Sequence, residues 1–158
     1  MELRIKQRVF TWRDSYDVYD EWGEARYEVA AEFFALGHQI HVVDRRSGRE
    51  VGSIHQKLFR FLPAFEIVIA GRSVGTICKE FSFLMPRYYV DFRGWNVTGN
   101  LMGWDYRVDQ GGRTVMTVSK ELFHWGDTYV LRYGQMADEI PGLLLVIAID
   151  AANCSQNR

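Results

Sequence analysis

Three stretches of the chain repeat one pattern of apolar side chains over fourteen positions, and this repeat restricts the fold more than any other sequence feature. The stretches are residues 5–18 (IKQRVFTWRDSYDV), 54–67 (IHQKLFRFLPAFEI) and 118–131 (VSKELFHWGDTYVL). Positions one, five and fourteen are aliphatic, position six is phenylalanine, and positions eight and twelve are aromatic in every copy. The chain therefore uses one supersecondary unit three times.

The repeated unit is predicted to be a pair of strands joined by a turn. Its apolar positions are spaced by two, which is the period of a strand. The buried side switches between positions five and six, where we expect a bend or a bulge. Turn-forming residues occupy positions nine to eleven, as in Leu62-Pro63-Ala64 and Gly126-Asp127-Thr128.

The aromatic residues of the repeat are interpreted as core. They could also line a ligand pocket, but one ligand rarely needs three equal walls, so internal repetition favours packing. We therefore expect Phe10, Phe59 and Phe123 to be buried to the same degree. The aromatic residues at position eight, Trp12, Phe61 and Trp125, are included in this expectation.

Hairpin signals fill the sequence between and around the copies. VVDRRSGREV (42–51) precedes the second copy and YRVDQGGRTV (106–115) precedes the third. Further turns are expected at Trp22-Gly23 and Ala70-Gly71-Arg72. Residues 25–34 (ARYEVAAEFF) alternate apolar and polar side chains and are assigned to a strand. The total is about twelve strands with short turns, which indicates a closed barrel or a sandwich.

The C-terminal segment is predicted to be a helix over about 138–152. It has no alternation and no polar face before Asp150, and Asp138 is a suitable N-cap. A helix that is apolar on all sides must be buried on all sides, and the inside of a barrel provides that environment. For Asp150 two readings stay open: contact with solvent at the barrel mouth, or an ion pair inside the barrel.

Composition excludes several classes of partner and location. The net charge of −1 provides no overall basic field for nucleic acid, so any anionic partner needs a local patch. The longest apolar run, residues 142–149, is shorter than the ~20 residues that span a bilayer. Cys78 and Cys154 form no CxxC motif and no secretion signal is evident, so we expect a cytoplasmic protein with free thiols, peripheral to a membrane if lipid is its ligand.

No catalytic or metal-binding motif is recognisable in the sequence. The GxSxG, HExxH and GxxxxGK patterns are absent. His38 and His41 are three residues apart, which on a strand places them on opposite faces. We therefore expect no enzymatic activity, no cofactor and no metal.

Several of these motifs resemble the LURP-one-related family. The resemblance rests on Gln7-Arg8-Val9-Phe10-x-Trp12, its partial repeat Gln56-Lys57-Leu58-Phe59, residues 111–129 and the closing LLLVIAIDAAN (143–153). It implies the fold of the tubby C-terminal domain and the phospholipid scramblases: one mainly β domain over 1–158, with twelve mostly antiparallel strands over about 2–133 closed around a buried hydrophobic C-terminal helix. Tubby domains bind phosphoinositide head groups through basic residues on the outer barrel.

Three functional hypotheses follow. The first is a non-enzymatic module that binds phosphoinositide or another anionic lipid head group at a membrane surface. The second is a scaffold for a protein partner. The third is a carrier or enzyme for a small apolar ligand inside the barrel, which a helix filling the barrel would oppose.

The anion site is predicted at the densest group of cations in the chain. Arg45, Arg46 and Arg49 crowd one hairpin turn, and we expect Lys57 and Arg60 on the following strand to assist them. Forked guanidinium donors suit phosphate oxygens. Arg4, Lys6 and Arg8 alternate along the first strand and are expected to share one face. The alternative reading of all these residues is ordinary solvated charge.

Overall fold

The structure, a computed structural model, describes residues 1–6, 15–34, 37–84, 87–123 and 126–155. These residues form twelve strands, a short 3-10 helix η1 (Met136–Asp138) and one α-helix, α1 (Glu139–Cys154). The strands are β1 (Glu2–Lys6), β2 (Ser15–Asp20), β3 (Ala25–Phe34), β4 (Gly37–Asp44), β5 (Glu50–Gln56), β6 (Ala64–Ile69), β7 (Arg72–Glu80), β8 (Arg87–Phe92), β9 (Asn96–Asn100), β10 (Asp105–Gln110), β11 (Arg113–Phe123) and β12 (Gly126–Tyr133).

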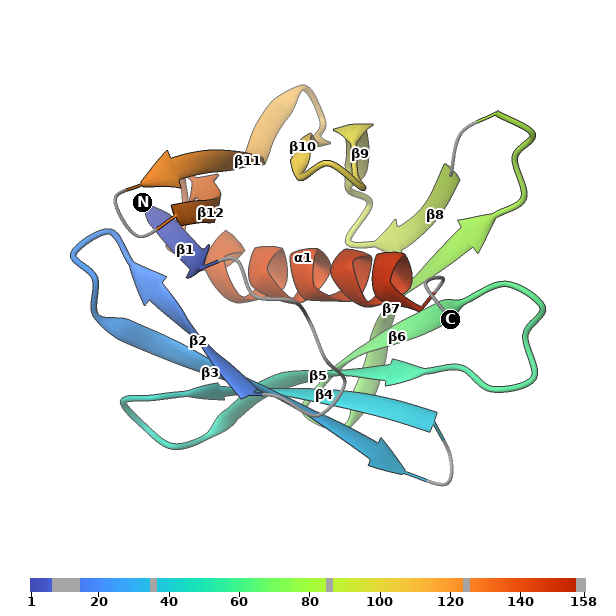
Figure 1. Cartoon of the computed structure of the whole chain (residues 1–158), viewed down its shortest axis with the longest axis horizontal. Helices are drawn as coiled ribbons and strands as arrows, with labels where there is room; N and C mark the ends of the chain where they lie inside the picture. Colours follow the sequence, from blue (N-terminus) through green and yellow to red (C-terminus); the bar gives the residue numbers. More distant parts are fainter. Residues whose placement is uncertain (7–14, 35–36, 85–86, 124–125, 156–158) are drawn as a thin grey trace.

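The strands form a single antiparallel sheet that curls into a nearly closed barrel around α1 (Figure 1). Each strand except β8 pairs with the next in sequence, and β1 also pairs with β12, from Glu2↔Arg132 to Lys6↔Thr128. The strands β8 and β9 are the two ends of the sheet, and no ladder joins them in the described residues. The expected mainly β barrel with a central helix is confirmed, whereas its complete closure is corrected at this one seam.

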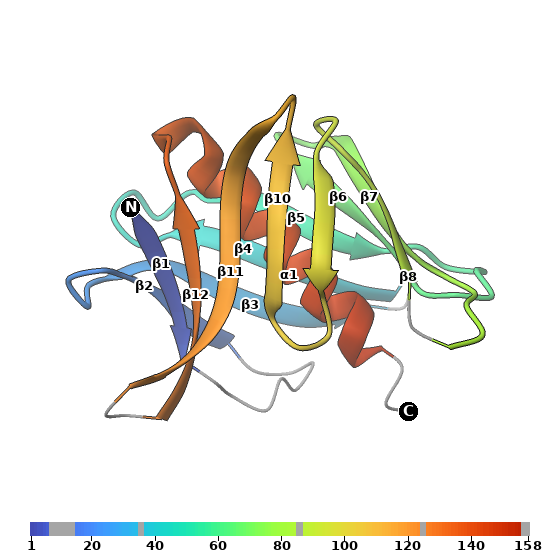
Figure 2. The ribbon, with the colours of Figure 1, turned by 90° about the horizontal axis from the view of Figure 1, so that it is seen from above.

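The connections between strands alternate between two rims of the barrel, because each strand is antiparallel to its predecessor. Among the described residues, the first rim carries the connections 57–63, 81–84 and 101–104, and the second rim carries 21–24, 45–49, 70–71, 93–95 and 111–112. The chain leaves β12 at the second rim, so α1 begins there and ends at the first rim. Figure 2 shows the helix crossing the barrel between the two rims.

The helix α1 forms the centre of the core. Residues 143–149 are each at most 1% exposed, and their side chains contact inward-facing residues such as Ile54, Ile67 and Val118 in one continuous cluster. Close contact also restricts the wall: a Cβ on Gly52 would lie 2.5 Å from Leu144 Cδ1. The predicted buried helix is confirmed. No described helix is both long enough and apolar enough to span a bilayer.

Polar contacts hold the start of α1 at the second rim. The buried Glu139 carboxylate accepts hydrogen bonds from the hydroxyls of Tyr27 and Tyr133, and Arg26 lies 3.3 Å away. Burial, followed by the hydrogen bond to Glu139, raises the pKa of both tyrosines. Asp138 occupies the predicted N-cap position, but its side chain does not cap the helix; it accepts a 2.9 Å hydrogen bond from Arg113.

The repeat corresponds to three hairpins with one shared geometry. Position one lies directly opposite position fourteen of the same copy: Ile5↔Val18, Ile54↔Ile67 and Val118↔Leu131. All six of these side chains are buried. The repeat therefore places three equivalent apolar pairs on the inner face of the barrel, next to the helix.

The expectation for the middle of the repeat is wrong where the structure describes it. Phe59 and Phe61 are fully exposed, at 104% and 95%, and Phe123 is only half-buried. In the second copy β5 ends at Gln56, and Phe59 adopts φ +58°, which turns its side chain out of the strand path. Phe10, Trp12 and Trp125 lie outside the described residues. The repeated aromatics thus include exposed loop residues at the first rim.

The end of α1 contains a carboxyl group in a mostly buried setting. Asp150 is half-buried, and burial raises its pKa to about 7. The Cys154 thiol lies 3.9 Å from the Asp150 Oδ1. Burial is the largest cause that raises the pKa of Tyr16, Tyr106 and Tyr129, and the negative charge of Asp150 raises it further. No described cation forms an ion pair with Asp150, so the ion-pair reading is not supported and the side chain lies between core and solvent at the first rim.

The first prediction tests whether the side chains of α1 are enclosed by the barrel. Ile147→Asp places an unpaired charge at a 1% exposed position, which costs several kcal/mol of the free energy of unfolding. Ile147→Val, the matched control, removes one methylene and costs about 0.5–1.5 kcal/mol. Urea unfolding followed by circular dichroism measures both. Comparable midpoints for the two variants would show that residue 147 is not enclosed by the barrel.

The second prediction concerns Asp150 and pH. Its folded-state pKa, about 7, lies above the ordinary value of 3.8, so the folded state favours the protonated form. The resulting stability is complete below pH 3.8 and is lost as pH rises to about 7. Asp150→Asn, which cannot ionise, is expected to be more stable than the wild type at pH 8 and to lose this pH dependence. Parallel stability curves for the two proteins between pH 4 and 8 would contradict this assignment.

Candidate functional site

The five basic residues predicted as an anion site lie at opposite rims of the barrel. Arg45, Arg46 and Arg49 occupy the β4–β5 turn at the second rim, whereas Lys57 and Arg60 occupy the β5–β6 connection at the first. Strand β5 separates the two groups, and its seven residues span about 23 Å at ~3.3 Å per residue. The structure therefore does not bring the five cations together.

The three arginines of the β4–β5 turn lie among carboxylates. Arg45 contacts Asp17 through Nε (3.0 Å) and Nη2 (2.7 Å), and its Nη1 lies 3.2 Å from Glu28. Arg46 lies 3.6 Å from Glu24, while Arg49 makes no ion pair among the described residues. Acidic partners thus neutralise much of the positive charge that the sequence suggested.

The same turn contains a carboxylate of its own. Asp44 accepts hydrogen bonds from the Arg46 backbone N–H (2.8 Å) and the Ser47 hydroxyl (3.1 Å). The bond from the Arg46 backbone, the largest cause, lowers the pKa of Asp44, so its negative charge persists in mild acid. The turn is therefore ordered by an internal carboxylate, which further weakens it as an anion site.

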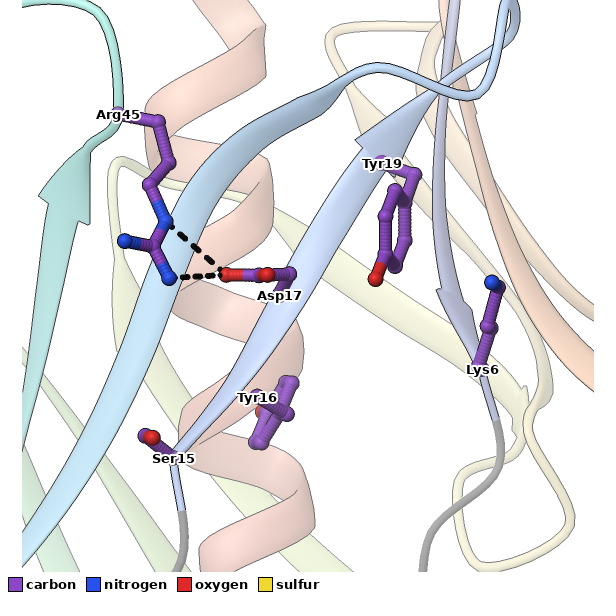
Figure 3. Close-up of a pocket in the computed structure, with 6 residues that line it drawn as sticks. All are labelled: Lys6, Ser15, Tyr16, Asp17, Tyr19 and Arg45. Atoms are coloured by element: carbon purple, nitrogen blue, oxygen red, sulfur yellow. Dashed lines mark hydrogen bonds and ion pairs between the residues drawn. The ribbon is translucent and has the colours of Figure 1, made fainter.

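A small groove on the outer face of β1 and β2 links Arg45 to the first strand (Figure 3). It has a volume of about 110 Å³ and is lined by Lys6, Ser15, Tyr16, Asp17, Tyr19 and Arg45. The Lys6 ammonium lies 4.5 Å from the centre of the Tyr19 ring, a cation–π contact. A neighbouring hollow of about 230 Å³ is lined by Arg4, Lys6, Tyr19 and Gly23.

The neighbouring hollow brings Arg4 and Lys6 of β1 together on one face as expected, whereas Arg8 lies outside the described residues. Arg4 is held by Glu2 and stacks on Phe123, with Cζ 5.0 Å from the ring centre. Lys6 and Arg4 thus each contact an aromatic ring, while Asp17 pairs with Arg45 and Glu2 pairs with Arg4, which reduces the net positive charge of the groove and the hollow. The volume of the groove suits a few water molecules better than a head group.

The most unusual surface of the protein is formed by two neighbouring connections at the first rim. Six large apolar residues, which we call the apolar tips, are exposed there: Leu58, Phe59, Phe61, Phe81, Phe83 and Leu84. Five of them are more than 80% exposed. The connections are adjacent because β6 pairs with β7, and the Lys79 backbone N–H donates a 3.0 Å hydrogen bond to the Pro63 carbonyl at their base. Figures 1 and 2 show both projecting from the same side of the barrel.

Cations accompany the apolar tips. Lys57 and Arg60 belong to the same connection, and Arg87 begins β8 just after the second one. Lys57 lies 3.4 Å from Glu66, whereas Arg60 and Arg87 are exposed and make no ion pair among the described residues. Two of the five predicted cations, Lys57 and Arg60, thus belong to the same connection as the exposed Phe59 and Phe61.

Sequence reasoning missed this surface because the repeat assigned Phe59 and Phe61 to the core. The sequence signal that could have revealed it is Pro63, which has no N–H to donate to a neighbouring strand and so favours a loop in the middle of the second copy. For Phe81, Phe83 and Leu84 the local pattern FSFL reads equally as a buried strand. Within the described residues, no group of three or more His, Cys, Asp or Glu side chains could hold a metal ion.

Comparisons with known proteins agree with this fold. The family model described as LURP-one-related matches residues 1–150. The "uncharacterized protein YxjI" of Bacillus subtilis (strain 168) is 31% identical over 150 residues, covering 95% of this chain and 92% of that protein. An X-ray structure of a protein from Arabidopsis thaliana superposes with a TM-score of 0.62 at 15% identity, covering 95% of this chain and 90% of the other. The chain belongs to the LURP-one-related family.

Proposed function

We propose that this protein is a non-enzymatic binding module that docks on an anionic membrane surface through the apolar tips at its first rim. The observation that carries the proposal is the exposure of six large apolar side chains on two adjacent connections. Monomeric proteins rarely expose contiguous apolar patches unless the patch binds something. Aromatic and aliphatic side chains on projecting loops are suited to the boundary between head groups and acyl chains.

Charge complementarity selects an anionic membrane over a neutral one. Arg60 and Arg87 have no acidic partner among the described residues, and Lys57 has a single one, Glu66. When the tips enter the interface, these cations lie at the level of the phosphates. Each cation near an anionic surface contributes about 1 kcal/mol, so three of them add a moderate, salt-sensitive attraction to the apolar contact.

The packing of α1 argues against the carrier hypothesis. A small apolar ligand inside the barrel would need the space that residues 143–149 fill, and each of these residues is at most 1% exposed. The volume available for such a ligand is therefore taken by the protein's own side chains. A lipid bound at the outer rim needs no such space.

The third prediction tests the tips by liposome co-sedimentation. The wild type is expected to pellet with vesicles that contain phosphatidylserine or phosphoinositide, and less with neutral vesicles or high salt. The double variant Phe59→Ser/Phe61→Ser is expected to lose at least tenfold in partitioning. Its stability should stay within about 0.5 kcal/mol of the wild type, because both side chains are exposed.

Matched controls come from the opposite rim. Trp22 is also an exposed aromatic residue, at 78%, so Trp22→Ser removes a similar side chain at the second rim and is expected to leave binding unchanged. Arg60→Ala and Arg46→Ala form a second pair, with about a fivefold loss expected only for Arg60→Ala. Equal pelleting with neutral and anionic vesicles would refute the preference for anionic lipid. Losses in Trp22→Ser and Arg46→Ala instead would refute docking through the first rim.

A further inference from the structure

The seam between β8 and β9 is the one interruption of the sheet within the described residues. Only three residues, Arg93 to Trp95, connect these strands, yet they do not pair as a hairpin. Arg93 and Gly94 both adopt positive φ, +55° and +66°, and the Trp95 backbone N–H donates a 2.9 Å hydrogen bond to the Phe92 carbonyl, so the seam is closed at this turn and opens beyond it. Figure 1 shows β8 and β9 diverging above the end of α1.

A pocket of about 420 Å³ lies along this seam. Residues of both edges line it, including Arg87, Tyr88 and Val90 on the β8 side and Trp95, Val97 and Gly99 on the β9 side. Its volume falls within the ~300–1,000 Å³ that is common for ligand sites. The empty seam is thus a groove with a strand edge on each wall.

The register of the sheet identifies the backbone groups that face the groove. Backbone groups of successive residues point to alternate neighbours. The two-residue turn Gly111-Gly112, with φ +56° and +80°, is flanked by the pair Gln110↔Arg113, whose backbone groups face each other. Alternation along β10 then directs Asp109, Arg107 and Asp105 toward β9, and leaves the backbone groups of Val97 and Gly99 facing the seam.

The same reasoning applies to β8. The turn Ala70-Gly71, with φ +50° and +74°, is flanked by the pair Ile69↔Arg72. Alternation along β6 and β7 directs Cys78 toward Tyr89, so the backbone groups of Tyr88 and Val90 face the seam. On each wall of the groove, the N–H and C=O groups of two residues therefore have no strand partner: Tyr88 and Val90 on β8, and Val97 and Gly99 on β9.

A buried donor in the groove also lacks a partner. Trp95 is 4% exposed and lines the pocket, and its indole N–H has no hydrogen-bond partner among the described residues. Buried donors of this kind are normally satisfied. At the first rim the two walls are bridged by Asn153 of α1, which accepts from the Tyr88 hydroxyl and donates to the Leu101 carbonyl at 3.3 Å. The helix side chain here takes the place of a strand-to-strand contact.

We propose that this seam accepts an extended segment of a partner protein, which adds a strand between β8 and β9. Only an extended polypeptide presents alternating N–H and C=O groups at the spacing that both walls require. Because Phe92 already pairs with Trp95 at the turn, the free backbone groups lie over Tyr88–Val90 and Val97–Gly99, and the segment pairs with these two stretches. Its inward side chains would lie near Val90 and Val97 and its outward ones near Tyr89 and Thr98, which selects alternating apolar and polar residues.

The proposal is tested by panning a phage-displayed library of random octapeptides against the full chain and synthesising the most enriched peptide. The dissociation constant is measured by fluorescence anisotropy. Val97→Pro removes a seam-facing N–H without removing a bond to β10, and is expected to weaken binding at least tenfold. Val97→Thr, the matched control, keeps the N–H and a branched side chain and is expected to change binding less than threefold.

Two further measurements keep the test decisive even where Val97→Pro fails to fold. The same peptide N-methylated at alternate residues is expected to lose at least tenfold in affinity in either frame, because one set of its N–H groups pairs with each wall. Hydrogen exchange of the wild type is expected to show peptide-induced protection at Tyr88, Val90, Val97 and Gly99.

Three results would overturn strand addition at the seam. They are no enrichment over the bare support, protection confined to other strands, or equal affinity of both N-methylated peptides and the parent. A concentration-dependent dimer that protects these amides without peptide would overturn the partner segment in favour of a second copy of the chain.

Discussion

The burial of an all-apolar helix is the constraint on which the rest of this structure depends. Residues 143–149 have no polar face, so the sheet must surround them instead of covering one side. Twelve strands are enough to curl around one helix and leave only a narrow seam. The small wall residue Gly52 follows from this arrangement, since a larger side chain would collide with Leu144.

The helix is held in the lumen by polar contacts near both ends. At the second rim Glu139 joins β3 and β12 through Tyr27 and Tyr133, and at the first rim Asn153 joins β8 to the β9–β10 connection. Hydrogen bonds to buried groups are expensive to leave unmade, so these contacts set the helix's position along the barrel axis more strictly than apolar packing alone. Asn153 thereby also links the two walls of the seam at the first rim.

The sequence predicted the parts of the fold that depend on local periodicity. Ile5, Ile54 and Val118 could be recognised as inward-facing because strand alternation and burial agree at these positions. Phe59 could not be placed correctly, because its positive φ and full exposure arise where β5 stops, and the repeat pattern continues past that point. The open seam was equally hidden, since Arg93-Gly94 between two apolar strands reads as an ordinary hairpin turn.

The candidate site was harder to predict because the sequence does not show which acidic side chains lie next to a basic residue in the folded protein. Arg45 looked like part of a basic cluster, but Asp17, 28 residues away in the chain, and Glu28 approach it in the fold. Lys57 and Arg60 were grouped with it by closeness in sequence, although a full strand separates them. Long-range pairing of side chains decides electrostatics, and periodicity carries no information about it.

The position of α1 after all twelve strands has a consequence for biosynthesis. Strand β1 pairs with β12, so the pair Glu2↔Arg132 can form only after Arg132 has left the ribosome. The helix α1, which fills the core, is synthesised later still. Until then the growing chain holds hairpins with an exposed apolar inner face and unpaired edges, which are prone to aggregate. Contacts this distant in sequence also slow folding. The barrel is therefore expected to assemble late in translation or after it, with the nascent hairpins as natural clients of holding chaperones.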